Sequence, residues 1–169
     1  MRVIGLDVGS KTIGVAVSDE LGYCAHALRT LDRRGTRADV QTVLGLAKQY
    51  GTTRLVVGLP YDCEGNEGKR AVRVRVLGDP LVQAGLQVDY QDESYSTVEA
   101  EEVLLEADLS RARRKQVVDR LAAAVILQAW LDAASRAAAL AQTQRAAAGP
   151  PAYGPPASAA ASAPGDEPA

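Results

Sequence analysis

Asp7 is the residue of this sequence that most needs a chemical explanation, because it interrupts the apolar run of residues 3–8. A strand that is apolar on both faces is normally covered by helices. An ionised carboxylate there is costly unless it is paired or binds a metal. The alternative is a structural aspartate that caps the following turn, but such a residue is expected beside Gly9 rather than inside the strand.

Two further acids could join Asp7. Glu93 follows Asp92 at the end of residues 85–93, where Leu86, Val88 and Tyr90 alternate as in a strand. Asp119 lies in a long predicted helix, beside small residues that let a helix approach a sheet closely. The alternative for Asp119 is a solvated acid that pairs with Lys115 one helical turn away.

Asp119 lies one residue to the side of the predicted core face of that long helix, and Trp130 is a bulky neighbour of the same face. The face comprises Val118, Leu121, Ala122, Val125, Ile126 and Ala129. Three carboxylates without a histidine would suit Mg²⁺ or Mn²⁺, which prefer oxygen ligands. Two such ions sharing a carboxylate can activate water and stabilise the leaving oxygen of a phosphodiester.

The elements that must position these acids form an α/β pattern. Two apolar runs around Gly9-Ser10-Lys11 predict a β-hairpin. Further strands are expected at residues 21–31, 55–60 and 85–93, and helices at 36–50, 69–84 and 110–140, with a capping box at 96–99 opening another helix. This order describes a mixed sheet with an antiparallel edge and a parallel half. Ligands of such sheets collect at the carboxyl ends of the parallel strands, where Asp7 and Glu93 are expected to meet.

The composition predicts one domain and a tail. Residues 1–141 have the length and apolar content of a single core, whereas residues 142–169 are mostly Ala, Pro, Gly and Ser and are expected to be disordered. The net charge of -2 gives no global attraction to nucleic acid, so a nucleic-acid partner needs a local basic patch. Cys24, Cys63 and His26 have no metal-ligand spacing. We expect a cytoplasmic protein, since no signal peptide or membrane span is evident.

Several sequence blocks occur in one order and resemble the YqgF (RuvX-type) family, relatives of the Holliday junction resolvase RuvC. They are Asp7-Val8-Gly9 with Gly14-Val15-Ala16, Val57-Gly58-Leu59-Pro60, Asp92-Glu93 with 96–100, and Arg114-Lys115 through Asp119 to Ala123. The resemblance covers residues 1 to about 135. It implies an RNase-H-like fold, with a five-stranded mixed sheet and helices on both faces. It also implies a nuclease of pre-16S rRNA 5′-end processing or of junction resolution, with Asp7, Glu93 and Asp119 as metal-binding, catalytic acids. Ser94 stands where the family commonly has an arginine.

The turn residues Gly9-Ser10-Lys11-Thr12 invite a phosphate-loop interpretation, which fails because the glycine required five positions earlier is Ile4. Asp7-Val8-Gly9 after an apolar strand also matches the phosphate-binding hairpin of actin-like ATPases. Those proteins close two domains on a nucleotide, and this chain has room for one. Lys11 and Thr12 either contact a backbone phosphate or are ordinary turn residues.

Basic residues form three clusters. The first contains Arg29, Arg33, Arg34 and Arg37, and we interpret it as a solvated face. The second includes Lys69 and Arg70, and the third precedes Asp119; candidate nucleic-acid contacts in the third are Arg111, Arg113, Arg114 and Lys115.

The sequence thus predicts a metal-dependent nuclease that uses Mg²⁺ or Mn²⁺ and an activated water, with structured RNA as the favoured substrate. One alternative is a DNA enzyme that cuts branched junctions, which should be a homodimer because it must act on two strands. The other is a non-catalytic factor of ribosome or transcription assembly. None of these alternatives requires a membrane.

Overall fold

A computed structural model describes residues 1–62, 64–92 and 111–147, with side chains omitted at 111–116 and 146–147. Its centre is a five-stranded sheet in the order β3-β2-β1-β4-β5. The strands are β1 (Ile4–Val8), β2 (Thr12–Ser18), β3 (Ala25–Asp32), β4 (Arg54–Leu59) and β5 (Gln87–Asp92). The first three pair antiparallel, and β4 and β5 continue the sheet in parallel with β1. The predicted mixed sheet, with its antiparallel edge and parallel half, is confirmed.

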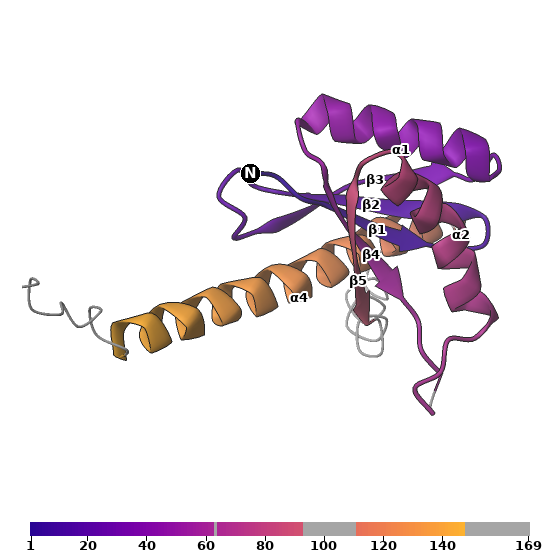
Figure 1. Ribbon diagram of the computed structural model, residues 1–169. Coiled ribbons are helices and arrows are strands. Elements are labelled where there is room, and N and C mark those ends of the chain that lie inside the picture. Colours follow the sequence, from indigo (N-terminus) through magenta and orange to yellow (C-terminus); the bar gives the residue numbers. More distant parts are fainter. Residues whose placement is uncertain (63, 93–110, 148–169) are drawn as a thin grey trace, which may run out of the picture.

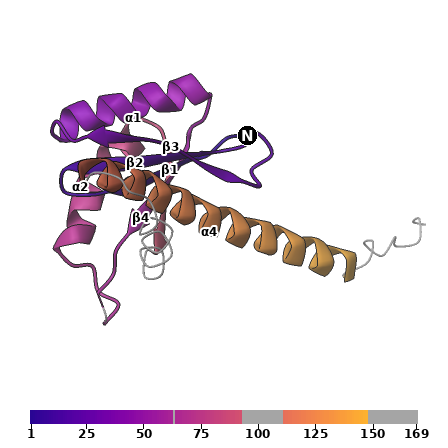
Figure 2. The same cartoon turned by 180° about the vertical axis from the view of Figure 1, so that it is seen from behind.

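Helices cover both faces of the sheet. Helices α1 (Thr36–Tyr50) and α2 (Lys69–Gln83) pack on one face, and α4 (Arg111–Ala147) crosses the other (Figures 1 and 2). The larger core lies under α1 and α2 and contains the alternate side chains Ile4, Leu6 and Val8 of β1. The smaller core lies under α4 and is built around Ala16, Val56 and Leu127. Side chains of a strand alternate between its two faces, so Asp7 belongs to the face that α4 covers.

Most elements lie close to where the sequence predicts them, with two differences. Strand β3 starts at Ala25 instead of residue 21, because the Asp19 carboxylate accepts the backbone N–H groups of Tyr23 and Cys24 and so shapes a turn. Helix α4 continues past Leu140 to Ala147, because its alanines are strong helix formers. Residues 142–147 are therefore helical, contrary to the predicted start of a disordered tail, and 148–169 lie outside the described residues.

Helix α4 is much longer than the sheet that it covers. Its 37 residues span about 55 Å, and the part that follows Leu131 has exposed side chains as far as they are described. Figures 1 and 2 both show this part projecting from the domain. No helix in the described ranges is long and apolar enough to cross a membrane.

Candidate active site

The candidate site begins with a close approach between α4 and the β1–β2 hairpin. Asp7 lies directly opposite Gly14 in the antiparallel ladder, so the two residues face the same helix. A Cβ atom added to Gly14 would lie 1.9 Å from the backbone oxygen of Asp119, and one on Gly5 would lie 2.7 Å from the Cβ of Leu127. Real Cβ contacts are never that short. The missing side chains of these two glycines are therefore what lets α4 lie directly on the strands.

This approach brings Asp119 to Asp7. Burial of the carboxyl group and, less strongly, the negative charge of Asp119 raise the pKa of Asp7 from 3.8 to about 6. The Arg70 guanidinium acts in the opposite direction and lowers that pKa. Asp7 and Asp119 were predicted to share a site from positions more than a hundred residues apart, and the structure places their charges within mutual influence.

Asp119 is itself an unusual residue. Its Oδ2 atom is buried and has no hydrogen-bond partner among the described residues. A buried polar atom without a partner costs about 1–3 kcal/mol, and more when it carries charge. A divalent cation would remove this cost and the repulsion from Asp7 together, and carboxylate oxygens are the ligands that Mg²⁺ and Mn²⁺ prefer. The residues present therefore fit such an ion.

The face of α4 that meets the sheet differs from the predicted one. The buried residues are Ala123, Ile126, Leu127 and Leu131, so the stripe that begins at Asp119 continues at helical spacing along the contact. The sequence-based face was right for Ile126 but otherwise lay about one position away along the helix, because it missed Leu127 and Leu131. The contact instead requires a small residue, Ala123, whose backbone oxygen lies 2.9 Å from a Cβ placed on Gly5. Asp119 consequently lies on the contact face rather than beside it.

Glu93, the third predicted acid, lies outside the described residues. It follows Asp92, the last residue of β5, which pairs with Leu59 at the end of β4. No group of three or more potential metal-ligating side chains is found within residues 1–62, 64–92 and 117–145. The described part of the candidate centre is therefore the Asp7–Asp119 pair.

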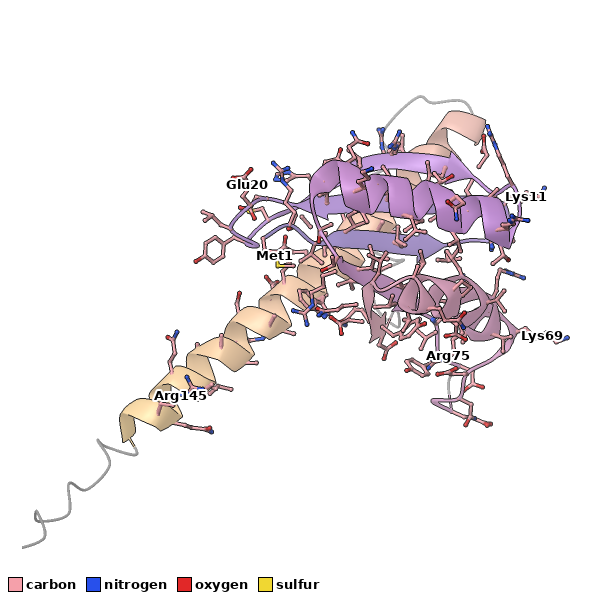
Figure 3. All side chains as sticks on the ribbon, turned by 45° about the horizontal axis from the view of Figure 1, so that its top comes forward. Met1, Lys11, Glu20, Lys69, Arg75 and Arg145 are labelled. Atoms are coloured by element: carbon pink, nitrogen blue, oxygen red, sulfur yellow. The ribbon has the colours of Figure 1, made fainter. Side chains whose placement is uncertain are left out.

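The predicted nucleic-acid contacts divide into three groups. Lys11, Lys69 and Arg70 are exposed, and Lys11 and Lys69 lie at the same end of the molecule (Figure 3). Thr12 is buried at 8% exposure, and its carbonyl oxygen accepts the Gly9 N–H at 2.9 Å. The remaining candidates lie in the first two turns of α4, where only the backbone is described: Arg111, Arg113, Arg114 and Lys115.

A buried ion pair near the hairpin was not among the sequence-based predictions. Arg33 Nε donates to Asp39 Oδ2 at 3.0 Å, with side-chain exposures of 13% and 3%, and Arg33 Nη1 donates to the Gly9 carbonyl at 3.3 Å. The interpretation of this arginine cluster as a solvated face is therefore wrong for Arg33. The spacing of Arg33 and Asp39 around Gly35, at the start of a predicted helix, was the signal that could have revealed the pair.

Comparison with known proteins shows which family the chain resembles. Residues 1–133 match a family model described as "RuvX: Holliday junction resolvase". A protein of Symbiobacterium thermophilum named "Putative pre-16S rRNA nuclease" is 52% identical over 134 residues, covering 79% of this chain and 93% of that protein. A protein of Myxococcus xanthus with the same name is 49% identical over 134 residues, covering 79% and 89%.

A solved structure shows the same fold. The fowlpox virus resolvase, in a complex with substrate Holliday junction DNA, has a TM-score of 0.50 at 11% identity, covering 79% of this chain and 98% of that one. The shared architecture is the RNase-H-like fold, as the sequence resemblance implied. The family model matches most of the chain, and the relatives are about half identical to it. The chain belongs to the RuvX family of RNase-H-like nucleases.

Proposed function

We propose that this nuclease is a metal-dependent enzyme that cleaves the 5′ region of a 16S rRNA precursor. The proposal is carried by one observation, the meeting of Asp7 with the partnerless buried oxygen of Asp119. The relatives named for pre-16S rRNA support RNA as the substrate. An rRNA precursor of a bacterium is matured in the cytoplasm, which is the compartment proposed here.

Asp7 and Asp119 would hold Mg²⁺ or Mn²⁺, with Glu93 as the third ligand because it directly follows β5. A divalent ion held there would lower the pKa of an attacking water and would stabilise negative charge on the phosphodiester. The protein itself fixes the geometry, because Gly5 of β1 and Gly14 of β2 let the regular helix α4 lie directly on both strands. Hydrolysis by water then needs no covalent link between enzyme and substrate.

The cationic side chains near the acids would bind the substrate backbone. Arg70 is close enough to Asp7 to lower its pKa, and it is exposed in the first turn of α2. A phosphate held between Arg70 and the acidic pair would lie where cleavage is proposed to occur. The other cationic residues proposed to contact phosphates are Lys11, Lys69, Arg111, Arg113, Arg114 and Lys115, whereas the burial of Thr12 favours an ordinary turn residue there.

A second candidate function is cleavage of branched DNA, which the description of the matching family favours. That activity would use the same acids but requires a homodimer, because two strands must be cut. The deciding experiment incubates the protein with Mg²⁺ or Mn²⁺ and end-labelled panels of precursor RNA, single-stranded DNA and a four-way junction. Specific cuts in the precursor RNA support the proposal, whereas symmetric cuts confined to the junction support the second candidate. Metal binding without cleavage of any of these nucleic acids would support the remaining alternative, a non-catalytic assembly factor.

A further inference from the structure

An arginine surface lies between β3 and the start of α1, on the side of the sheet that faces away from α4. We define it as Arg29 of β3, Arg34 of the connecting segment and Arg37 of α1. All three side chains are exposed. None of the three guanidinium groups has a hydrogen bond or an ion pair within the part of the chain that the structure describes. Their charges are therefore available to a ligand.

The surface is hollowed. A cleft of about 320 Å³ is lined by Arg29 and Arg34 together with Thr42 of α1. A more open depression of about 510 Å³ adjoins it and is lined by Arg34 and Arg37. Arg34 belongs to both, so the three arginines border one continuous concave strip rather than three separate points.

The acids of this region do not neutralise the strip. Asp39 lines the cleft, but it accepts Arg33 Nε at 3.0 Å and the Arg34 backbone N–H at 2.9 Å. Its charge is thus balanced by Arg33, which is not part of the arginine surface. Asp32 also lines the cleft and is exposed, which leaves three positive charges against one negative charge. The Asp39 contact also fixes the backbone of Arg34, so one wall of the cleft is already in place.

The strip is connected to the candidate active site through the hairpin turn. The Arg33 N–H donates to the Lys11 carbonyl at 2.9 Å, and Arg33 Nη1 donates to the Gly9 carbonyl at 3.3 Å. This turn directly follows β1, the strand that carries Asp7. Strand β3 is two positions from β1 in the sheet, which corresponds to about 10 Å. Each nucleotide of one strand of a duplex advances about 3.4 Å along the helix axis, so a few nucleotides suffice to pass from the acids around Lys11 to the strip.

We infer that the arginine surface binds the phosphodiester backbone of the substrate beyond the cleavage point, on the far side of the hairpin from α4. This inference rests on the proposed function, since it assigns a second contact to the same nucleic acid. A backbone fits the strip because it offers evenly spaced negative charges along a path and makes no demand for base recognition. The surface would thus lengthen the bound segment and raise the affinity for long substrates.

The test compares the parent with a triple variant, Arg29→Gln, Arg34→Gln and Arg37→Gln, which keeps Arg33 and its buried partner intact. Binding to RNAs of about 6 and about 25 nucleotides is measured by fluorescence anisotropy across a salt series, with EDTA present to prevent cleavage. We expect the triple variant to bind the long RNA at least about tenfold more weakly and its salt slope to fall by about 2. The ratio of long-RNA to short-RNA affinity should fall accordingly.

The matched control removes three exposed cations elsewhere: Lys48→Gln, Arg136→Gln and Arg145→Gln. Arg145 lies at the opposite end of the molecule from Lys11 (Figure 3). This control should bind the long RNA like the parent. A triple variant that keeps the parental salt slope and affinity for the long RNA overturns the inference while leaving the proposed nuclease function untouched. Conversely, a parent that binds long RNA through the strip but cleaves no RNA or DNA with Mg²⁺ overturns the proposed function alone. A parent that binds no nucleic acid overturns both.

Discussion

The backbone oxygen of Asp119 occupies the space that a side chain on Gly14 would need, 1.9 Å from the ideal Cβ position. Gly14 is also the ladder partner of Asp7. One missing methyl group thus controls the distance between the helix that carries one acid and the strand that carries the other. The proposed metal centre depends on this contact between backbones.

Replacing Gly14 with alanine should therefore impair activity without changing any acid. The new methyl group must push α4 away from β2, which costs about 1–3 kcal/mol of unfolding free energy for overpacking and separates Asp119 from Asp7. Cleavage should fall by about tenfold or more at a metal concentration that saturates the parent. The measurements are denaturant unfolding and initial cleavage rates.

Gly45→Ala provides the control for that variant. Gly45 lies within α1, and a Cβ placed there meets nothing within 4 Å. The alanine should stabilise the protein by about 0.5–1 kcal/mol through helix propensity and leave cleavage unchanged. Equal activity of Gly14→Ala and Gly45→Ala would show that the close approach is not needed for the site.

The Asp7 carboxyl makes a prediction for the metal-free protein. Its pKa is about 6 in the folded chain against an ordinary value of 3.8, so the folded state binds this proton more tightly than the unfolded state. The resulting contribution to the unfolding free energy is present below about pH 4 and is lost as the pH rises through about 6. Its size is about 3 kcal/mol, since one pKa unit corresponds to about 1.4 kcal/mol. Urea unfolding in EDTA at several pH values measures it.

Asp7→Asn should remove this pH dependence, because the amide does not ionise. Above about pH 6 the metal-free variant should accordingly be more stable than the metal-free parent, although it should lose cleavage by orders of magnitude. If the parent and Asp7→Asn show the same change in stability between about pH 4 and pH 7 in EDTA, the pKa of the Asp7 carboxyl group is not raised in the folded protein.

The buried pair of Arg33 and Asp39 should matter for stability. Arg33→Ala leaves the Asp39 carboxylate buried without its partner, which costs about 3–5 kcal/mol. Arg2→Ala is the matched control, because the Arg2–Glu20 pair has side-chain exposures of 39% and 78% and should contribute less than about 1 kcal/mol. Thermal unfolding of the two variants should differ by many degrees. Similar melting temperatures would contradict a structural role for the Arg33 pair.

The end of α4 should be dispensable. A chain that stops at Ala141 loses only residues beyond the last buried contact, Leu131, so it should keep the melting temperature and the cleavage rate. A chain that stops at Ala129 loses Leu131 and Trp130 from the core under α4 and should fail to fold. A melting temperature several degrees lower in the chain ending at Ala141 would show that the projecting helix contributes to stability.

Much of this architecture was predictable because it follows from local signals. The hairpin around Gly9 and the helix of residues 36–50 carry clear turn and periodicity patterns, and Asp7 stands out as a charge within an apolar strand. The rotation of α4 was not predictable from hydrophobicity, since its contact depends on Ala123 and on two glycines far away in the sequence. The same holds for Arg33, whose burial depends on the position of the hairpin turn. The role of Glu93 stays a prediction.

The most direct test of the Asp7–Asp119 centre uses two variants of one helix. Asp119→Asn removes the charge of the partnerless buried carboxylate, and Asp132→Asn removes that of an exposed carboxylate three to four turns further along α4. Mn²⁺ binding is measured by calorimetry and Mg²⁺-dependent cleavage with labelled precursor RNA. We predict that Asp119→Asn binds Mn²⁺ at least about tenfold more weakly and cleaves orders of magnitude more slowly, while Asp132→Asn matches the parent. Parental metal affinity and cleavage in Asp119→Asn would contradict the account.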